Sequence, residues 1–533
     1  MGPGGPAQAE AGMPGNPQAL WQQGQRHAEL RQWEPAIACF RRLLAQDRGF
    51  LPAWMELARI HEAQDHYRDA CAAVLEASRV DDVPPMAALV VARALRKFDE
   101  LPRMQDYVER MRLPSRLPPE KLIDLASFFS SAGDHASAMG FTQRALAINP
   151  DLAEAQHMLG LLLMFEGRAE SSAAALERTL AIKPGFASAR SVLSRVRKAT
   201  PQRHQVDELR RQLAQPGLAP KDEAHLAFAL HNELHDLGEF DPAWDALVRG
   251  CRARQIEQPW DAAGTLAAIE RWKATFDRDF VRGEPLDDPL TPIFIIGLHR
   301  TGTSLLERML SGHPEVADAG ETHVFTAQLC HATDHVCRQT SDEVLATRAA
   351  TADFAGVGRG FLEAMRRRSK GKPFLTEKQN PNFMLAGAIA RSLPHARILH
   401  MRRSPVDTCF SNLRTLFTNE AAYSYDQVHM ADFYRTYRDL MAHWRDVMPE
   451  RLFDVDYEDL VREPGEQARR VAAHCGFAYR DDMLRVDRDS GVVATASASQ
   501  VRGGIVTNRG GLWRPYEHHL GPLLDRLAAH GLV

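Results

Sequence analysis

Residues 297–304 carry the strongest sign of chemistry in the sequence. The segment reads GLHRTGTS, follows the unbroken apolar run of residues 293–296, and precedes apolar residues at helical spacing up to Leu310. A glycine-bounded loop between a buried strand and a helix directs backbone N–H groups at an anion. We therefore predict that this loop holds a phosphate-like group; a glycine turn that binds nothing is the alternative.

The spacing of this loop fits the nucleotide-triphosphatase motif except at one position. Thr303 stands where that motif requires the lysine that reaches the β- and γ-phosphates, and Arg300 lies inside the loop instead. The pattern disfavours an ATPase or kinase and favours a shorter anion, such as one phosphate joined to one sulfate. A small-molecule kinase on a phosphate-loop fold stays open as an alternative.

A second basic site follows a second predicted strand. Residues 396–401 form this strand, Arg402 and Arg403 come directly after it, and Ser411 follows on a predicted helix. A fixed guanidinium and a hydroxyl near a helix start suit a doubly charged phosphate. Arg402 is either a second contact or a solvated neighbour. Between residues 363 and 414 there are eleven Lys or Arg against three acidic residues, a local charge of +8 that also favours an anionic ligand.

The elements before residue 290 repeat with a fixed period. Residues 147–150 and 181–184 read AINP and AIKP, 34 positions apart, and Trp33 and Tyr67 share that offset. The period, the small residues where helices cross, and the closing proline resemble the tetratricopeptide repeat, whose stacked helix pairs form a solenoid. Residues 86–118 are a degenerate unit, and an irregular helical domain is the alternative.

Composition sets the limits of the remaining expectations. The 533 residues are 44% hydrophobic with a net charge of −4, so a general nucleic-acid binder is disfavoured. The seven cysteines are scattered, and no apolar run is long enough for a membrane span, so we expect a cytoplasmic protein. The predicted organisation is a disordered N-terminus (1–18), a repeat domain (19–200), a helical linker or capping repeat (201–288) and an α/β domain (289–533).

Taken in order, the motifs of residues 290–525 resemble those of sulfotransferases. The resemblance is closest to the protein-tyrosine sulfotransferase branch and its bacterial relatives fused to tetratricopeptide repeats. It implies a phosphate-loop-like α/β domain, a parallel sheet flanked by helices, that uses 3′-phosphoadenosine 5′-phosphosulfate as donor. It also implies a 3′-phosphate site at Arg403 and Ser411. The donor's 5′-phosphosulfate would be bound by Gly297, His299, Arg300, Thr301, Gly302, Thr303 and Ser304.

The same resemblance implies the catalytic groups. Glu321, in Gly-Glu-Thr after the first helix, matches the branch's general base, and Lys378 matches its catalytic lysine. Arg300 would neutralise charge at the 5′-phosphate, and Ser497 in Ser-x-x-Gln-Val would contact the sulfate. His323 departs from the branch, which has there an arginine that helps to hold an acidic peptide. An acidic acceptor is therefore in doubt.

The expected function is transfer of a sulfuryl group to an acceptor hydroxyl. A protein tyrosine, a saccharide, a lipid head group and a small phenol all stay open as acceptors, and the repeats favour a protein acceptor or partner. No metal is required; Cys330, His331, His335 and Cys337 lie close together, but ligands on one helix rarely converge on zinc. A repeat scaffold with a nucleotide-binding platform is the non-enzymatic alternative.

Overall fold

The structure is a computed structural model that describes residues 16–418, 420–486, 504–505 and 510–533. The chain divides into two compact units. One ends at Leu117 and includes Asp334–Val336; the other comprises Pro118–Thr333 and Cys337–Val533. Among the described helices, none has the length and apolar character that crossing a membrane requires.

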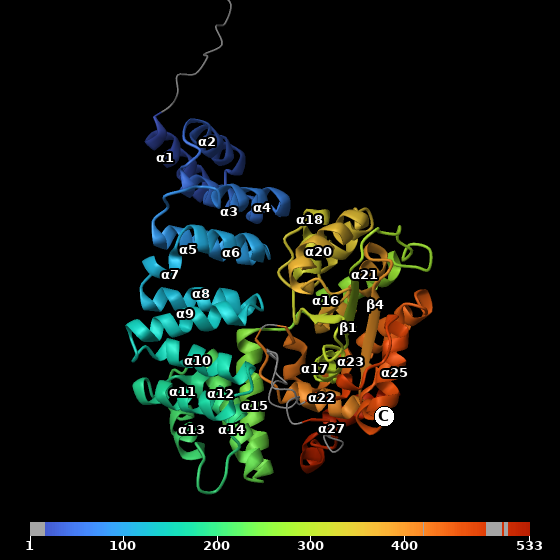
Figure 1. Cartoon of the computed structure of the whole chain (residues 1–533). Helices are drawn as coiled ribbons and strands as arrows, with labels where there is room; N and C mark the ends of the chain where they lie inside the picture. The colour runs from blue at the N-terminus through green and yellow to red at the C-terminus, as the bar shows by residue number, and fades with distance from the viewer. Residues whose placement is uncertain (1–15, 419, 487–503, 506–509) are drawn as a thin grey trace, which may run out of the picture. The chain divides into compact units, whose positions relative to one another are not determined.

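Helix pairs make up the N-terminal part of the chain. The first unit contains α1 (Pro17–Glu29), α2 (Trp33–Gln46), α3 (Leu51–Ala63), α4 (Tyr67–Ala77), α5 (Pro85–Lys97), α6 (Leu101–Arg110) and α7 (Leu113–Arg116). The second unit begins with α8 (Pro119–Ser131), α9 (His135–Ile148), α10 (Ala153–Phe165), α11 (Ala169–Ile182) and α12 (Ala187–Val196). Figure 1 shows α8 to α12 stacked on one another. The first helices of successive pairs begin at 17, 51, 85, 119, 153 and 187. The predicted 34-residue repeat is therefore confirmed, and it continues in register through the degenerate unit.

Small residues explain how the helices of a pair approach each other. The same position of the first helix recurs as Gly24, Ala58, Ala92, Ala126 and Gly160. A Cβ atom at Gly24 would lie 2.5 Å from the Phe40 ring, and one at Gly160 would lie 2.7 Å from Leu176. The second helix thus places a large side chain over each of these glycines. Any larger residue there would force the two helices apart.

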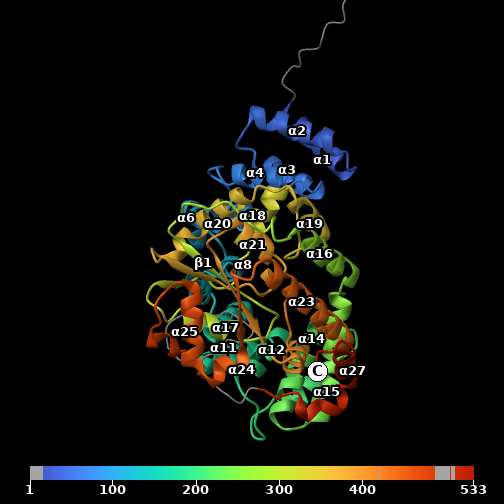
Figure 2. The same ribbon diagram turned by 90° about the vertical axis from the view of Figure 1, so that its right-hand side faces the viewer.

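Four more helices lead into the sheet domain: α13 (Val206–Leu213), α14 (Pro220–Asp236), α15 (Phe240–Glu257) and α16 (Ala262–Thr275). Helices α14 and α15 form an antiparallel pair, joined at Gly238 with φ of 79°, and lie side by side in both views (Figures 1 and 2). Trp272 of α16 is fully buried and donates to Ser341 Oγ at 2.6 Å. Phe276 is also fully buried and packs against Phe354 and Trp444. Helix α16 is therefore part of the core of the sheet domain.

A five-stranded parallel sheet organises the C-terminal part. Its strands are β1 (Thr291–Ile296), β2 (Val316–Asp318), β3 (Phe374–Glu377), β4 (Arg397–Arg402) and β5 (Leu452–Asp456), in the order β2-β3-β1-β4-β5. The helices among them are α17 (Thr303–Leu310), α18 (Val324–Thr333), α19 (Glu343–Ala349), α20 (Phe354–Ser369), α21 (Ala386–Ser392), α22 (Pro405–Leu413), α23 (Gln427–Val447), α24 (Tyr457–Arg462), α25 (Pro464–Cys475) and α27 (Gly521–Ala529). Four 3₁₀ helices complete them: η1 (Asn380–Phe383), η2 (Ala422–Tyr425), η3 (Asp481–Leu484) and η4 (Arg514–His519). The predicted architecture, a helical repeat region followed by an α/β domain, is confirmed.

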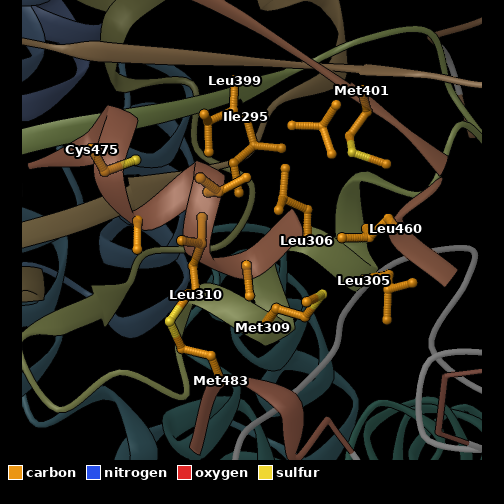
Figure 3. Close-up of a cluster of buried hydrophobic side chains, with 14 of the residues drawn as sticks. Ile295, Leu305, Leu306, Met309, Leu310, Leu399, Met401, Leu460, Cys475 and Met483 are labelled. Atoms are coloured by element: carbon orange, nitrogen blue, oxygen red, sulfur yellow. The ribbon is translucent and has the colours of Figure 1, made fainter. Parts of the chain in front are cut away.

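Side chains alternate between the two faces of β1, the central strand. Ile293 and Ile295 face a core built with α17, α24 and α25, in which Leu306 and Leu310 meet Leu399 (Figure 3). Phe294 faces the other side, where it packs against Phe325 of α18 and Phe361 of α20. Both faces are covered, and residues 292–296 of β1 are all apolar and buried, as expected for a central parallel strand.

The closing segment at η4 attaches to the helices that precede the sheet. Tyr516 is fully buried, and its hydroxyl lies 2.8 Å from His235 Nδ1 of α14. Its ring also packs against Phe410 of α22. His519 stacks on Trp244 of α15 with 5.0 Å between ring centroids. Helices α14 and α15 are thus joined to the same segment as α22.

Candidate active site

The loop between β1 and α17 has a backbone that only glycine permits at two positions. Gly297 and Gly302 have φ of 149° and 105°. A Cβ atom at Gly297 would lie 2.7 Å from Met401 O, and one at Gly302 would lie 2.6 Å from the Tyr457 ring. The Thr301 hydroxyl holds the turn closed by donating to Leu298 O at 2.8 Å. The loop therefore has a fixed shape that ends at the N-terminus of α17.

That N-terminus presents backbone donors and hydroxyls together. Thr303 and Ser304 are the first two residues of α17, and both are buried. The first N–H groups of a helix have no partner within the helix and attract anions. The Thr303 hydroxyl donates to Asn380 Oδ1 at 3.3 Å, so it is oriented from the segment that carries Lys378. The predicted cradle is present in the geometry of these residues.

Arg300 connects the loop to the second basic site. It has φ of 70°, and its Nε donates to Ser411 Oγ on α22 at 3.1 Å. Its carbonyl oxygen accepts from Arg403 Nη1 at 3.2 Å. The Arg403 guanidinium also lies 4.7 Å from the centre of the Tyr457 ring. The structure thus brings Arg300 together with Arg403 and Ser411, which lie about 100 positions further along the chain.

Arg402 faces away from this cluster. Its guanidinium donates to both carboxylate oxygens of Asp456, at 2.9 and 2.7 Å, and to Asp454 Oδ2 at 3.1 Å. Both carboxylates belong to the neighbouring strand β5. Of the two roles left open for Arg402, the structure favours that of a residue outside the anion site.

Glu321 and Lys378 form an ion pair across neighbouring strands. Strands β2 and β3 are parallel, and Lys378 N donates to Gly320 O at 3.0 Å just beyond them. The Lys378 ammonium, fully buried, donates to Glu321 Oε1 and lies 4.0 Å from Glu307 Oε2. Burial alone would lower the pKa of Lys378, but the two carboxylates raise it above its ordinary value. The amine is therefore a permanent cation in the folded protein.

Glu307 is a buried acid that the sequence analysis did not identify. It lies on α17, and burial together with Asp318 raises its pKa well above the ordinary value. Glu307 therefore holds a proton more readily than an ordinary glutamate, and Glu321 is the closer of the two partners of Lys378. Nothing in the local sequence marks Glu307, because it sits among the apolar residues that predict the helix.

Two asparagines that the sequence analysis also missed support the loop. Asn380 Nδ2 donates to Leu298 O at 3.1 Å, and Asn412 Nδ2 donates to His299 O at 2.7 Å. Asn380 follows Lys378 by two residues, and Asn412 follows Ser411 directly. Their place beside predicted site residues is the only signal that could have pointed to them.

A second buried carboxyl group lies behind the ion pair. Glu377 accepts from Thr322 Oγ1 at 3.2 Å and from Asn382 Nδ2 at 2.9 Å. Burial raises its pKa to about 8. Because Thr322 follows Glu321 and Glu377 precedes Lys378, this bond fixes the two catalytic segments relative to each other.

Around the ion pair lies a further group of polar side chains. His299 Nε2 is 3.4 Å from Glu420 Oε2, and Gln379 Nε2 donates to Glu420 Oε1 at 3.4 Å. His323 Nδ1 is 3.5 Å from Gln379 Nε2. Burial would raise the pKa of Glu420, but the hydrogen bond and charge of His299, together with His323, lower it to about 2. Glu420 is thus an ionised carboxylate next to the site, and the sequence analysis missed it.

The remaining predicted residues are placed as follows. Ser497 lies outside the residues that the structure describes, so its predicted contact with the sulfate stays a prediction. Helix α18 ends at Thr333, so His331 lies on the helix and His335 beyond it. The expectation that His331 and His335 lie on one helix is therefore wrong.

The arrangement separates two kinds of charge. Arg300, Arg403 and the N-terminus of α17 supply donors to an anion, and Lys378 lies at the edge of that group. Glu321 supplies a carboxylate that can accept a proton from an incoming hydroxyl. Such a site can hold a doubly anionic group and deprotonate a nucleophile that attacks it.

Comparison with known proteins agrees with this chemistry. Residues 292–481 match the Sulfotransferase family. An uncharacterized protein of Aquifex aeolicus (strain VF5) is 26% identical over 343 residues, 62% of this chain and 44% of that protein. A Drosophila melanogaster protein-tyrosine sulfotransferase is 25% identical over 233 residues, 42% of this chain and 46% of that protein. The chain thus spans less than half the length of these curated relatives.

Solved structures include similar domains. The sulfotransferase domain from the Synechococcus PCC 7002 olefin synthase covers 47% of this chain and 97% of its own length. Its sequence identity is 18% and its TM-score is 0.33.

Proposed function

Because residues 292–481 match the Sulfotransferase family, we propose that this chain transfers a sulfuryl group from 3′-phosphoadenosine 5′-phosphosulfate to an acceptor hydroxyl. One observation carries the proposal. Arg300 belongs to the glycine loop, contacts Ser411 through its side chain, and accepts from Arg403 through its carbonyl. A donor with phosphates at both the 3′ and the 5′ position of its ribose needs two anion sites, and this contact joins two candidates for them.

The donor fits the residues on the loop. The 5′-phosphosulfate would lie against Gly297, His299, and the backbone and hydroxyls of residues 300–304. The 3′-phosphate would be bound by Arg403 and Ser411. Guanidinium groups and helix N-termini are the groups that proteins use most for phosphate. A 3′-phosphate site selects this donor over ordinary nucleotides.

The chemistry follows from the ion pair. The acceptor oxygen attacks the sulfur, its proton passes to Glu321, and a new O–S bond forms as the bond from sulfur to the phosphate oxygen breaks. Lys378 and Arg300 stabilise the negative charge that grows on the departing phosphate oxygen. The other product is 3′-phosphoadenosine 5′-phosphate. Ser497 is proposed to hold a sulfuryl oxygen.

We further propose that the acceptor hydroxyl belongs to a tyrosine of a protein. Its support is the similarity to the protein-tyrosine sulfotransferase of Drosophila melanogaster and the presence of helical repeats, which offer extended surfaces to peptides. The repeats would then recruit the acceptor or a partner protein.

Titration calorimetry with 3′-phosphoadenosine 5′-phosphate tests the donor site. We expect binding that is tighter than that of 5′-AMP, ADP or ATP–Mg. Arg403→Ala and Arg300→Ala should each weaken it by about 10- to 100-fold, since each removes charged hydrogen bonds. Arg402→Ala is the matched control: it removes the same charge one residue away, and the affinity should be kept.

The same titration decides between the alternatives. A preference for ATP–Mg would favour a kinase, and a folded protein that binds none of these nucleotides would favour a scaffold. Either result would overturn the proposed function.

A further inference from the structure

The acceptor side of the site contains a fixed negative charge. Glu420 lies where three catalytic segments meet. Its partner His299 directly precedes Arg300, and its partner Gln379 directly follows Lys378. His323, which lowers the pKa of Glu420, is two residues beyond Glu321. Glu420 therefore lies next to the loop and next to the segments that carry Glu321 and Lys378.

The charge of Glu420 is not neutralised by a permanent cation. In the described part of the chain, its salt-bridge partner is His299 at 3.4 Å, and its other hydrogen bond comes from an amide. An imidazole is charged only when it is protonated. Lys378, which directly precedes the Glu420 partner Gln379, is paired with Glu321. A carboxylate held in this way can still bind a cation.

Aromatic rings lie beside His299, the salt-bridge partner of this carboxylate. His299 lies 5.0 Å from the Phe417 ring, and His299 Nδ1 is 3.2 Å from the Tyr423 hydroxyl. Tyr423 in turn stacks on Phe433 with 3.7 Å between centroids. The side chain of Glu420 is 41% exposed, so it remains accessible to a ligand.

From these contacts we infer that the acceptor carries a cationic group, an ammonium or guanidinium, close to the hydroxyl that is sulfated, and that Glu420 binds it. The inference rests on the proposed function and narrows its acceptor class. It also gives roles to two histidines: His299 and His323 keep Glu420 ionised and oriented. An acidic acceptor would be repelled by the same carboxylate.

Three small phenols of matched size test this inference. Tyramine carries a positive side chain, 4-ethylphenol a neutral one, and 4-hydroxyphenylacetate a negative one. With saturating donor, we expect kcat/KM to fall in that order, with tyramine about three- to tenfold better than 4-ethylphenol, as for one partly exposed charged contact.

Variants at Glu420 separate recognition from folding. Glu420→Gln should remove the preference for tyramine over 4-ethylphenol, and Glu420→Lys should favour 4-hydroxyphenylacetate. Asp525→Asn, on α27, removes an equal exposed charge and should change nothing. For phenols that react too slowly, saturation-transfer NMR on protein loaded with 3′-phosphoadenosine 5′-phosphate gives the same ranking by affinity.

The outcomes distinguish the inference from the proposed function. Equal rates and affinities for the three phenols, a preference for the anionic one, or no binding of any of them would overturn the cationic acceptor. If the bisphosphate still binds in that case, the sulfotransferase proposal stands. If wild-type protein does not bind the bisphosphate, the proposed function itself is wrong.

Discussion

Lys378 and Glu321 are the two residues whose protonation states matter most at the site. Lys378 is fully buried, and its raised pKa keeps it charged. Glu321 is its hydrogen-bonded partner, and burial raises the pKa of Glu307 on the other side well above the ordinary value. When the donor binds, its departing phosphate oxygen offers Lys378 a second anion. Glu321 is then the group that can take the acceptor's proton.

Replacement of the base tests this division of roles. Glu321→Gln should lower kcat by about 10²- to 10⁴-fold, the usual effect of losing a general base. The affinity for 3′-phosphoadenosine 5′-phosphate should stay within about twofold, because Glu321 does not contact the loop that we assign to the phosphates. Calorimetry and initial rates measure the two quantities. Glu343→Gln, an exposed residue of α19, is the control. A variant that keeps a third of the wild-type kcat would show that another group is the base.

Glu377 predicts a pH effect on stability. Its pKa is about 8 in the folded protein and near 4.5 when unfolded, so the folded state holds a proton that the unfolded state releases between these values. Stability therefore falls as pH rises from about 5 to 8. Glu377→Gln keeps a neutral group at every pH. Asn382 can accept from it, because the buried Asn382 Oδ1 has no hydrogen-bond partner among the residues that the structure describes.

We expect Glu377→Gln to match wild type near pH 5 and to be more stable at pH 8, by ~2–5 kcal/mol. Urea unfolding at the two pH values measures this difference. Glu343→Gln should show no such gain. A variant that is destabilised equally at both pH values would mean that Glu377 is ionised in the folded protein.

Among the elements, the loop between β1 and α17 depends most on its backbone. Gly302→Ala would place a Cβ atom 2.6 Å from the Tyr457 ring and strain a residue at φ of 105°. We expect a loss of ~1–3 kcal/mol in the free energy of unfolding, together with at least tenfold weaker binding of 3′-phosphoadenosine 5′-phosphate. Thermal unfolding and calorimetry measure these effects.

Gly521→Ala is the matched control for this variant. Gly521 is the first residue of α27, and a Cβ atom there would meet no other atom within 4 Å. It should be neutral for both stability and binding. If Gly302→Ala behaves like Gly521→Ala, the loop does not need its observed shape to bind the anion.

Elements that are continuous in sequence were the ones that could be predicted. The run of residues 293–310 contains its own strand, turn and helix, and the 34-residue period follows from spacing alone. The three-residue strand β2 has too few residues for a pattern, and the strand order depends on tertiary packing. Glu307 and Glu420 become site neighbours only when distant segments meet. Their chemistry therefore could not be predicted from local sequence.

At the scale of the whole molecule, helices that precede the sheet in sequence contribute side chains to the core of the sheet domain. Trp272 and Phe276 of α16 are fully buried against residues of the sheet domain, and Tyr516 bonds to His235 of α14. A fragment of residues 289–533, the domain boundary predicted from sequence, would lose these contacts. Removal of a buried aromatic side chain of this size costs ~3–5 kcal/mol.

We therefore expect the 289–533 fragment to lack a cooperative thermal transition and near-UV circular dichroism. A fragment that begins at Pro118, the start of the second compact unit, should unfold cooperatively. It should also bind 3′-phosphoadenosine 5′-phosphate like the full chain. Cooperative unfolding of the shorter fragment would show that the helices are an independent domain.

The contact between Arg300 and the second basic site has a consequence for turnover. The loop and the Arg403–Ser411 pair share this one residue, so a ligand that engages both phosphate sites meets a single preformed surface. Loss of the sulfuryl group removes neither phosphate. Most of the contacts that bind the nucleotide therefore remain after the reaction. Departure of the spent nucleotide should then be slower than the chemical step, and the enzyme would show a burst of product before a slower steady state.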